Sequence, residues 1–266
     1  MKQKGSILVL ELIEHLGSFV LHLCEGLGAF CIFLAKAVYT LCTTKPKIHK
    51  FFFQMNRIGI ESFNIIILTG SFTGMVFALQ SYIGFQRVGG EQFIGAVVAL
   101  GLIRELGPVL TGLMVTGRAG SAITAEIGTM RITEQIDALV TLRINPFQYL
   151  VVPRILASMI VMPFLTLFAM IFGIVGGYFV CVYVLELSPE DYRSSIRAYV
   201  EMADIIGGLI KAAVFGLILG WVGTYKGYKT QGGASGVGIA TTESVVQSSI
   251  MILIANYFLT KLLERL

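Results

Sequence analysis

Two charged residues and a proline lie inside a segment that is otherwise apolar enough to cross a membrane. Arg104 and Glu105 are adjacent, and Pro108 follows within about one helical turn. Adjacent helical residues point about 100° apart, so the two charges do not neutralise each other side by side. A charged side chain deep in a bilayer costs about 2.5–3.5 kcal/mol on insertion scales. At least one of the two is therefore expected to meet a partner helix or a wet cavity.

Pro108 weakens the backbone at the same place, because it has no amide to donate to the carbonyl of Arg104. A loosened backbone inside a membrane is tolerated only where protein or a cavity covers it. The pattern favours a broken helix that lines a substrate path. The alternative is a buried ion pair that joins two helices.

The composition places these residues in a membrane protein. The chain has 266 residues, of which 55% are hydrophobic and 14% charged, and its mean hydropathy is +0.80. A soluble domain contains about 25% charged residues, so lipid must be part of this chain's solvent. The net charge is only +4, and the basic residues are dispersed among apolar segments. Nucleic acid is therefore not an expected partner.

Five stretches are long and apolar enough to span a bilayer core, which needs about 20 residues in a helix. They cover residues 58–82, 93–117, 155–185, 205–225 and 245–263. The expected fold is an all-α integral membrane protein, in which residues 51–266 form a permease domain with these five transmembrane helices. Residues 1–50 are expected to form an N-terminal amphipathic helix and a basic linker.

The N-terminal helix carries a polar stripe at helical spacing through its apolar sequence. The stripe consists of Glu11, Glu14, His15, Ser18, His22 and Glu25. A helix of this kind prefers to lie in the membrane interface. The alternative is a sixth spanning helix whose polar stripe is turned towards partners.

Lys and Arg in the short loops set the expected orientation. The segment before the first span, the loop between the second and third spans and the loop between the fourth and fifth spans are basic, and we expect them in the cytoplasm. The loop after the third span is acidic on balance and is expected outside. In it, Ser188, Pro189, Glu190 and Asp191 predict the start of a short external helix. The N-terminus is then cytoplasmic and the C-terminus external.

Three spans contain glycines four residues apart, a spacing that lets helices approach closely. The pairs are Gly70 and Gly74, Gly173 and Gly177, and Gly216 and Gly220. They predict a compact bundle or a dimer interface, and they carry no information about the substrate.

The sequence lacks the patterns of an enzyme. It has no GxxxxGK[ST] to cradle nucleotide phosphates, and its histidines and cysteines show no metal-ligand spacing. No catalytic residue, metal or cofactor is expected in this chain. The apolar spans favour a lipid substrate, because each buried CH₂ contributes about 0.8 kcal/mol and lipid tails need an apolar chamber. A small polar solute would need several hydrogen-bonding residues in the spans, and Gln80 and Asn64 are the main candidates.

The segment that follows the second span has the pattern of a short amphipathic helix. Residues 126–139 are too polar to span, yet Ile132, Gln135 and Leu139 recur at helical steps. We expect this helix to lie across the cytoplasmic mouth, where another protein can dock. The alternative is a surface helix without a partner.

Several blocks of the sequence resemble the MlaE (YrbE) family of ABC transporter permeases, which move phospholipids or related lipids. The stretch "LIRELGPVLTGLMVTGRAGSAITAEIGTMRITEQIDAL" is similar to the signature of that family. Three others, "GMVFALQSY", "NPFQYLVVPRILA" and "GYKTQGGASGVGIATTESVVQSS", are similar to further blocks in the same order. The likeness runs from about residue 58 to the end. Glu243 departs from the more basic residue that the family carries in the last block.

The resemblance implies a homodimeric permease in the bacterial inner membrane that contributes to membrane lipid asymmetry. The implied partners are two cytoplasmic ABC ATPase subunits that use ATP and Mg, an MCE-domain lipid-binding protein on the outer face and often a STAS-domain protein. Residues 126–139 would form the coupling helix, seated in a groove of the ATPase. The implied ATPase contacts are Glu126, Met130, Arg131, Glu134 and Asp137.

The resemblance also implies a lipid cavity near the external side of the dimer. Its residues would be Arg104, Glu105 and Leu106 of the "REL" motif, with Phe77, Leu79, Gln80 and Tyr82 from the end of the first span. The alternative function is an ion-coupled secondary transporter that uses the Arg/Glu pair, with Glu105 as the proton site. The coupling-like helix and the lack of an internal repeat favour ATP-driven transport, and a membrane scaffold would leave the intramembrane charges unexplained.

Overall fold

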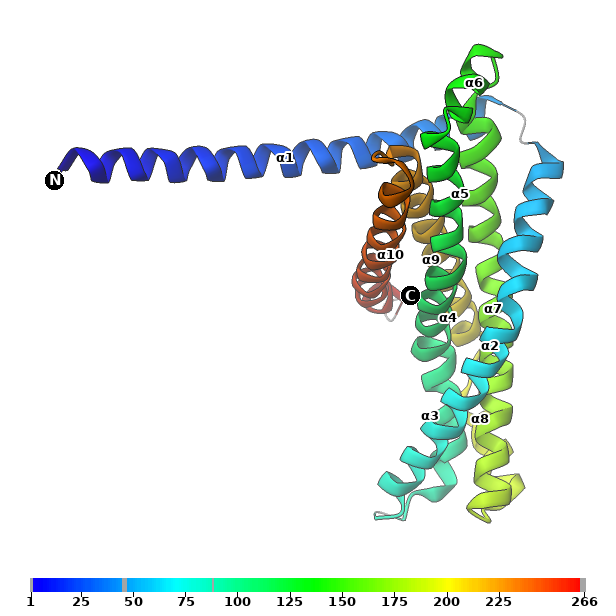
Figure 1. The fold of residues 1–266 in the computed structure, drawn as a ribbon. Coiled ribbons are helices and arrows are strands. Elements are labelled where there is room, and N and C mark those ends of the chain that lie inside the picture. The colour runs from blue at the N-terminus through cyan, green and yellow to red at the C-terminus, as the bar shows by residue number, and fades with distance from the viewer. Residues whose placement is uncertain (1, 45–46, 88, 264–266) are drawn as a thin grey trace. The chain divides into compact units, whose positions relative to one another are not determined.

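The computed structural model describes residues 2–44, 47–87 and 89–263. Every regular element in these residues is a helix (Figure 1). Six helical segments in this part of the chain are long and apolar enough to cross a membrane, which confirms the all-α membrane fold. They are Cys24–Thr43, Ile48–Phe85, Glu91–Ile132, Phe147–Val184, Met202–Lys229 and Gly233–Leu263. The chain is a multi-pass membrane protein.

The N-terminal unit of the chain, Met1–Lys45, contains one long helix, α1 (Lys2–Thr43). Its second half, Cys24–Thr43, is long and apolar enough to span a bilayer. The interfacial helix and the sixth span are therefore both compatible with its length and composition. Most side chains of the predicted polar stripe, those of Glu11, Glu14, His15 and His22, lie outside the described part of the chain.

The second unit, Pro46–Leu266, is the helical bundle that holds the predicted permease domain. Its first span is α2 (Ile48–Phe85). The second span joins η1 (Glu91–Phe93), α3 (Ile94–Gly101), η2 (Leu102–Leu106), α4 (Gly107–Val115), η3 (Thr116–Gly120) and α5 (Ser121–Ile132). The third joins η4 (Phe147–Val151), α7 (Val152–Phe179) and η5 (Val180–Val184), and the last two are α9 (Met202–Lys229) and α10 (Gly233–Leu263). Most of these helices extend beyond the predicted spans, because helical structure continues into the polar flanks that a search for apolar residues leaves out.

Small residues hold the centre of this bundle together. A Cβ atom at Gly74 of α2 would overlap the carbonyl group of Gly173 in α7, and one at Gly216 of α9 would overlap the backbone of Ser158 in α7. The backbones of α2 and α9 therefore both touch that of α7, a closeness that only a residue without a side chain permits. The predicted role of the glycine pairs in a compact bundle is confirmed.

A short helix, α8 (Pro189–Tyr199), begins where the capping pattern predicts. The Oγ of Ser188 accepts a hydrogen bond from the amide of Asp191 at 3.5 Å. Tyr192 is buried and donates a hydrogen bond to the carbonyl of Ile174 in α7 at 3.1 Å. Burial, and secondarily Cys181, raises the pKa of Tyr192 well above its ordinary value, so the phenol stays protonated and keeps α8 against the bundle.

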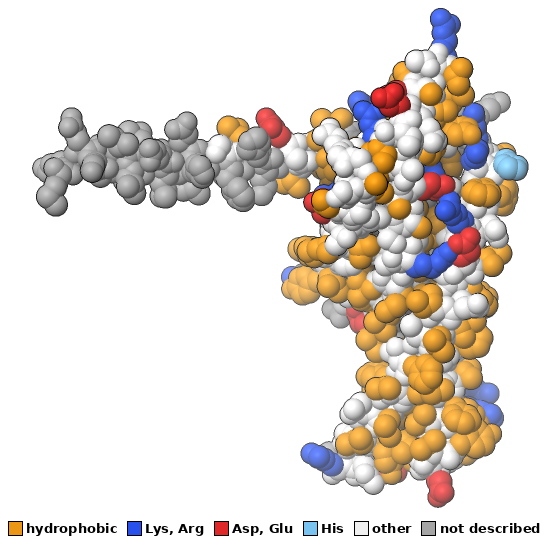
Figure 2. Space-filling view, viewed as in Figure 1, with side chains coloured by type: hydrophobic (Ala, Val, Ile, Leu, Met, Phe, Trp, Pro, Cys, Tyr) orange, Lys and Arg blue, Asp and Glu red, His pale blue; other side chains and the backbone are white. Residues whose placement is uncertain are grey.

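The three basic regions of the sequence meet at one end of the bundle. The ammonium groups of Lys47 and Lys50 lie 4.8 and 4.7 Å from the centre of the Tyr149 ring, and the guanidinium of Arg131 lies 6.0 Å from that of Tyr228. This basic end is also where α6 lies (Figure 1). Figure 2 shows hydrophobic side chains over much of the visible face of the bundle away from this end, as expected of a lipid-facing protein.

The segment 126–139 is not the single short helix that its pattern predicts. It is divided between the end of α5 and a separate helix, α6 (Gln135–Thr141). The break falls at Glu134, whose left-handed backbone (φ 58°, ψ 13°) cannot continue a right-handed helix. Ile136 is fully buried and anchors α6, while Val140 and Leu142 beyond it are exposed. The two helices form a hairpin at the basic end.

Candidate functional site

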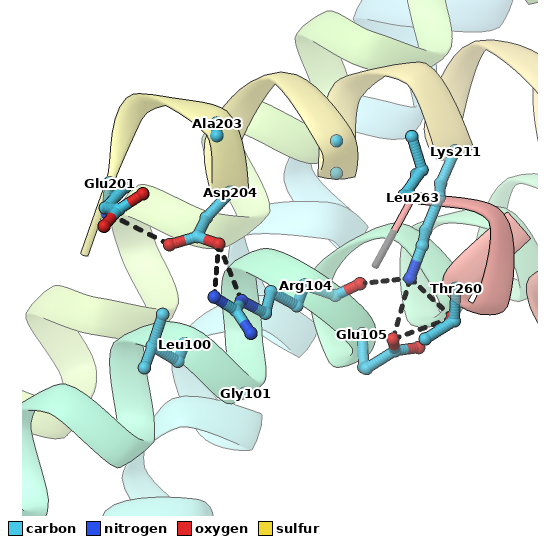
Figure 3. A pocket seen from close by; sticks show the side chains of 12 residues that line it. Leu100, Gly101, Arg104, Glu105, Glu201, Ala203, Asp204, Lys211, Thr260 and Leu263 are labelled. Atoms are coloured by element: carbon cyan, nitrogen blue, oxygen red, sulfur yellow. Dashed lines mark hydrogen bonds and ion pairs between the residues drawn. The ribbon is translucent and has the colours of Figure 1, made fainter. Parts of the chain in front are cut away.

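A cavity of about 520 Å³ lies between the middle of the second span, the start of α9 and the end of α10. Figure 3 shows the side chains that line it. Its charged and polar lining residues are Arg104, Glu105, Glu201, Asp204, Lys211 and Thr260. Leu100, Ala203 and Leu263 add an apolar part to the wall. The volume is typical of a ligand site.

A single wide helical turn places Arg104 and Glu105 at this cavity. Residues Leu102–Leu106 form a π-helix, in which the amide of Gly107 donates to the carbonyl of Leu102 five residues earlier. In a regular helix the ring of Pro108 would press on the carbonyl of Arg104, and the wider turn avoids this contact. The helix then continues as α4. The broken helix expected from the proline is therefore a helix that continues through a π-turn at this point.

Glu105 is bound by α9 and α10. Its Oε1 lies 2.7 Å from the Nζ of Lys211 and accepts a hydrogen bond from the Oγ1 of Thr260 at 2.9 Å. Its Oε2 accepts a hydrogen bond from the Nδ2 of Asn256 at 2.8 Å. The side chain of Lys211 is only 4% exposed, whereas that of Glu105 is 38% exposed. The pair thus has one member deep in the bundle and one at the cavity.

Arg104 makes a separate ion pair. Its Nε donates to the Oδ1 of Asp204 at 2.7 Å, and a second guanidinium nitrogen lies 2.6 Å from the same oxygen. The other oxygen of Asp204 accepts from the amide of Glu201 at 3.0 Å and so caps the first turn of α9. The side chain of Arg104 is 54% exposed, and Figure 3 shows it beside the cavity.

The two adjacent charges therefore pair with different partners and not with each other. Both pairs join the second span to α9, and both line the cavity. The sequence pattern did not indicate their partners Asp204, Lys211, Asn256 and Thr260. Lys211 could have been identified from the sequence as a residue that needs a partner, because it is the only charged residue between Asp204 and Lys226 in its span. Among the described residues, no three His, Cys, Asp or Glu side chains gather as metal ligands would.

The other residues implied for the lipid cavity lie elsewhere in the single chain. Phe77, Tyr82 and Leu106 pack against a buried apolar cluster that includes Val98 and Tyr192. Leu79 and Gln80 are exposed on α2. The structure thus brings Arg104 and Glu105 to the cavity, whereas the residues of α2 line a separate apolar surface. Their role in lipid contact stays a prediction.

The residues predicted to contact an ATPase fall into two groups. Arg131 and Asp137 form an ion pair of 2.8 Å that joins α5 to α6, and Glu134 between them is exposed. Met130 is half-buried at the end of α5. Glu126 instead forms ion pairs within the bundle, where it joins α5 to α2 and α7.

The two carboxylate oxygens of Glu126 have different arginine partners. Oε1 lies 2.7 Å from Arg57 of α2, and Oε2 lies 2.9 Å from Arg154 of α7. Arg154 is buried and also donates to the carbonyl of Leu150 at 2.8 Å. Nearby, Arg118 pairs with Glu61 and donates to the Oγ of Ser62 at 2.9 Å. These contacts hold α2, α5 and α7 together below the hairpin.

Comparison with known proteins identifies the family of this chain. The sequence profile described as "Permease MlaE" matches residues 51–262. A probable ABC transporter permease protein of Rickettsia conorii is 53% identical over 209 residues, which cover 79% of this chain and 81% of the relative. A probable ABC transporter permease protein of Synechocystis is 43% identical, with 79% and 80% covered.

A third relative has a more specific name. The intermembrane phospholipid transport system permease protein MlaE of Haemophilus influenzae is 38% identical over 224 residues, which cover 82% of this chain and 86% of the relative. The region that matches the profile, residues 51–262, contains every charged residue of the cavity and the α5–α6 hairpin. The resemblance found in the sequence blocks is therefore confirmed, and the chain belongs to the MlaE permease family.

Proposed function

We propose that this chain is the non-catalytic transmembrane subunit of an ATP-driven ABC transporter that moves phospholipids or related lipids. The observation that carries the proposal is the match of residues 51–262 to the MlaE permeases, one relative of which is named for intermembrane phospholipid transport. The six apolar helices support a multi-pass subunit. ATP and Mg would be used by a separate ATPase, and the lipid would pass between the bacterial inner membrane and an MCE-domain protein.

The α5–α6 hairpin supports a docking role for the ATPase. It lies at the basic end of the bundle, which we assign to the cytoplasm by the distribution of Lys and Arg. Glu134 and Asp137 are exposed there, and so are the apolar side chains of Val140 and Leu142. A mixed polar and apolar surface of this kind suits a protein partner. With this orientation the N-terminus is cytoplasmic and the C-terminus external.

Glu126 connects the hairpin to the rest of the bundle. It holds α5 to α2 and α7 through Arg57 and Arg154, so it fixes the base from which the hairpin projects. We propose that Met130, Arg131, Glu134 and Asp137 contact the ATPase and that Glu126 transmits their movement to the bundle. A push on the hairpin would then reach three helices at once.

The charged cavity supports a lipid path near the external side. Arg104 uses only part of its guanidinium for Asp204 and is more than half exposed, so it has donors left for the phosphate of a lipid headgroup. We propose that a homodimer brings the exposed residues Leu79 and Gln80, with Phe77, Leu106 and Tyr82 behind them, to the walls that hold the tails. An MCE-domain protein would receive or deliver lipid there, and a STAS-domain protein would bind the ATPase.

The ion-coupled alternative receives less support from the geometry of Glu105. A proton site must exchange its proton freely, but both oxygens of Glu105 already accept hydrogen bonds, one of them from the buried ammonium of Lys211. Protonation would leave that ammonium without its ion pair. The family match also favours transport driven by an ATPase partner.

Co-purification tests the proposal. The full-length chain, expressed with its genomic ATPase partner, is expected to retain that ATPase in detergent, and Glu134→Lys or Asp137→Lys is expected to release it while the permease stays folded. Glu190→Lys, an exposed acid on α8, is the matched control. The purified chain alone is expected to show no ATP hydrolysis. ATPase retention by both hairpin variants would contradict the docking assignment, and lipid transport on a proton gradient without any ATPase would contradict the function.

A further inference from the structure

A second pocket, of about 210 Å³, lies at the basic end of the bundle between α2, α5 and the start of the third span. It shares no lining residue with the charged cavity. Its wall includes Lys50 and Phe53 from α2, Tyr149 from η4 and Arg154 from α7. Glu126 and Met130 at the base of the hairpin also line it, but its lysines and Tyr149 have no part in the proposed ATPase contact or in the lipid path near Arg104.

Positive charge is in excess at this pocket. The ammonium groups of Lys47 and Lys50 both lie within 5 Å of the Tyr149 ring centre, at 4.8 and 4.7 Å. In the part of the chain that the structure describes, no carboxylate lies within ion-pair distance of either lysine. Two like charges gathered on one ring repel each other, and the arrangement is relieved when an anion lies between them.

The single carboxylate of the pocket is already neutralised. Glu126 lines it, but one of its oxygens is bound to Arg57 and the other to Arg154. Two cations, Lys50 and Arg154, thus line the pocket with this one carboxylate, and two more lie beside it, Lys47 at the Tyr149 ring and Arg57 at Glu126. The Nε of Arg154 is buried and has no hydrogen-bond partner among the described residues, so this guanidinium has donor capacity left. Ammonium and guanidinium groups together are the donors that bind phosphate oxygens.

An apolar surface borders the pocket on α2. Phe53 lines the pocket and is 52% exposed, and Phe52 beside it is 61% exposed. Large exposed aromatic side chains next to a phosphate-binding set of cations match a ligand with a charged head and an apolar tail. The basic end is also where the orientation rule places the cytoplasmic leaflet, whose anionic lipids attract basic segments next to a membrane span.

From this arrangement we propose that the pocket binds the phosphate headgroup of an anionic phospholipid from the cytoplasmic leaflet. Lys47, just before α2, and Lys50 in its first turn contact the phosphate. The ring of Tyr149 orients the two ammonium groups, and Phe52 and Phe53 lie along the acyl chains. The bound lipid joins the basic segment before α2 to the third span. This site is independent of the proposed transport function, because it requires neither an ATPase nor the cavity at Arg104.

Lipid retention by the full-length chain tests the site. The chain is reconstituted in nanodiscs that contain phosphatidylglycerol and phosphatidylcholine, and the lipids that stay bound after transfer to detergent are measured by native mass spectrometry over a series of phosphatidylglycerol contents. Lys47→Gln/Lys50→Gln is the test variant. Arg143→Gln/Lys229→Gln is the matched control, because it removes the same charge from exposed positions outside the pocket.

Wild type is expected to retain phosphatidylglycerol in preference to phosphatidylcholine. Each lysine near an anionic surface contributes about five-fold in affinity, so the test variant is expected to bind phosphatidylglycerol about ten- to thirty-fold more weakly, and the control variant as wild type does. Tyr149→Leu is expected to weaken retention in the same direction. Equal retention by wild type and Lys47→Gln/Lys50→Gln, or an equal loss in the control variant, would overturn the proposal.

A second experiment distinguishes a lipid headgroup from free phosphate as the ligand of the pocket. Thermal unfolding of the detergent-purified chain is followed with added phosphatidylglycerol, phosphatidylcholine or inorganic phosphate at millimolar concentration. A rise in Tm with phosphatidylglycerol alone, lost in Lys47→Gln/Lys50→Gln, supports the lipid headgroup as ligand. A rise of the same size with inorganic phosphate, lost in the same variant, would show that the pocket takes a free anion and would overturn the lipid assignment.

Discussion

The ammonium group of Lys211 donates a hydrogen bond to the backbone carbonyl of Arg104 at 2.8 Å. In a regular helix that carbonyl would bind the amide of residue 108, but Pro108 has none. The same ammonium pairs with Glu105 at 2.7 Å and with the hydroxyl of Thr260 at 2.7 Å. Lys211 of α9 thus replaces the backbone hydrogen bond that Pro108 cannot make and also neutralises the carboxylate of Glu105.

Removal of this ammonium is expected to be costly. Lys211→Met leaves Glu105 without its ion-pair partner and the carbonyl of Arg104 without its donor, and the loss of one partner of a buried pair costs about 3–5 kcal/mol. Chemical unfolding of the full-length chain in detergent measures the change. Lys229→Met, at an exposed position of the same helix, is the control and is expected to stay within about 0.5 kcal/mol of wild type.

A double variant sharpens this test. Glu105→Gln combined with Lys211→Met removes both charges, so it is expected to be more stable than Lys211→Met alone. If Lys211→Met by itself unfolds at the wild-type denaturant concentration, the lysine does not have the structural role described here.

Arg104 is expected to affect lipid binding more than stability. Its side chain is 54% exposed, so loss of its ion pair with Asp204 is expected to cost at most about 1 kcal/mol. Arg104→Gln is expected to lower the amount of co-purified phospholipid several-fold, as measured by mass spectrometry of lipid extracts. Arg193→Gln, an exposed arginine of α8, serves as the control. Unchanged lipid content in Arg104→Gln would remove this residue from the headgroup site.

Glu126 and Glu134 are expected to behave differently although both lie near the hairpin. Glu126→Gln removes the charge between Arg57 and the buried Arg154 and is expected to lower the stability of the isolated permease by about 2 kcal/mol. Glu134→Gln lies at an exposed position and is expected to leave that stability unchanged. Both are measured by unfolding without ATPase present. Wild-type stability of Glu126→Gln, combined with loss of ATPase binding, would make Glu126 a direct contact instead.

The contact between α2 and α7 is expected to tolerate no side chain at Gly74. Gly74→Ala places a methyl group on the carbonyl of Gly173 and is expected to lower the Tm, because overpacking costs about 1–3 kcal/mol or more. Gly84→Ala, in the same helix, meets nothing within 4 Å and is expected to be neutral or slightly stabilising. Equal Tm values for the two variants would mean that the helices separate easily at this contact.

The sequence predicted those parts of the fold that depend on neighbouring residues. Long apolar runs located the spans, and the capping residues Ser188 and Pro189 located the start of α8. The partners of Arg104 and Glu105 were not predictable in this way. Asp204 and Lys211 lie 100 and 106 positions away, and only the packing of α9 against the second span brings them together.

Local backbone detail was also beyond the sequence pattern. Pro108 correctly indicated where the regular α-helix is interrupted, but a proline predicts a broken helix and a π-turn equally well. The periodic residues of segment 126–139 suggested one helix, because a glutamate rarely adopts the left-handed backbone that Glu134 has. The pocket at Tyr149 was not predictable, because its cations come from regions far apart in the sequence, whose Lys and Arg indicated only the membrane orientation.

The backbone contacts made at Gly74 and Gly216 limit how this protein can move. Where two main chains touch, no side chains lie between them that could adapt by changing rotamer. We therefore expect α2, α7 and α9 to move together as one rigid unit. The helix α10 contacts the second span through side-chain hydrogen bonds. Ser244 accepts one from Thr124, and Asn256 donates one to Glu105. Such bonds can exchange partners one at a time, so if the bundle opens for a lipid as proposed, we expect the opening to run along α10.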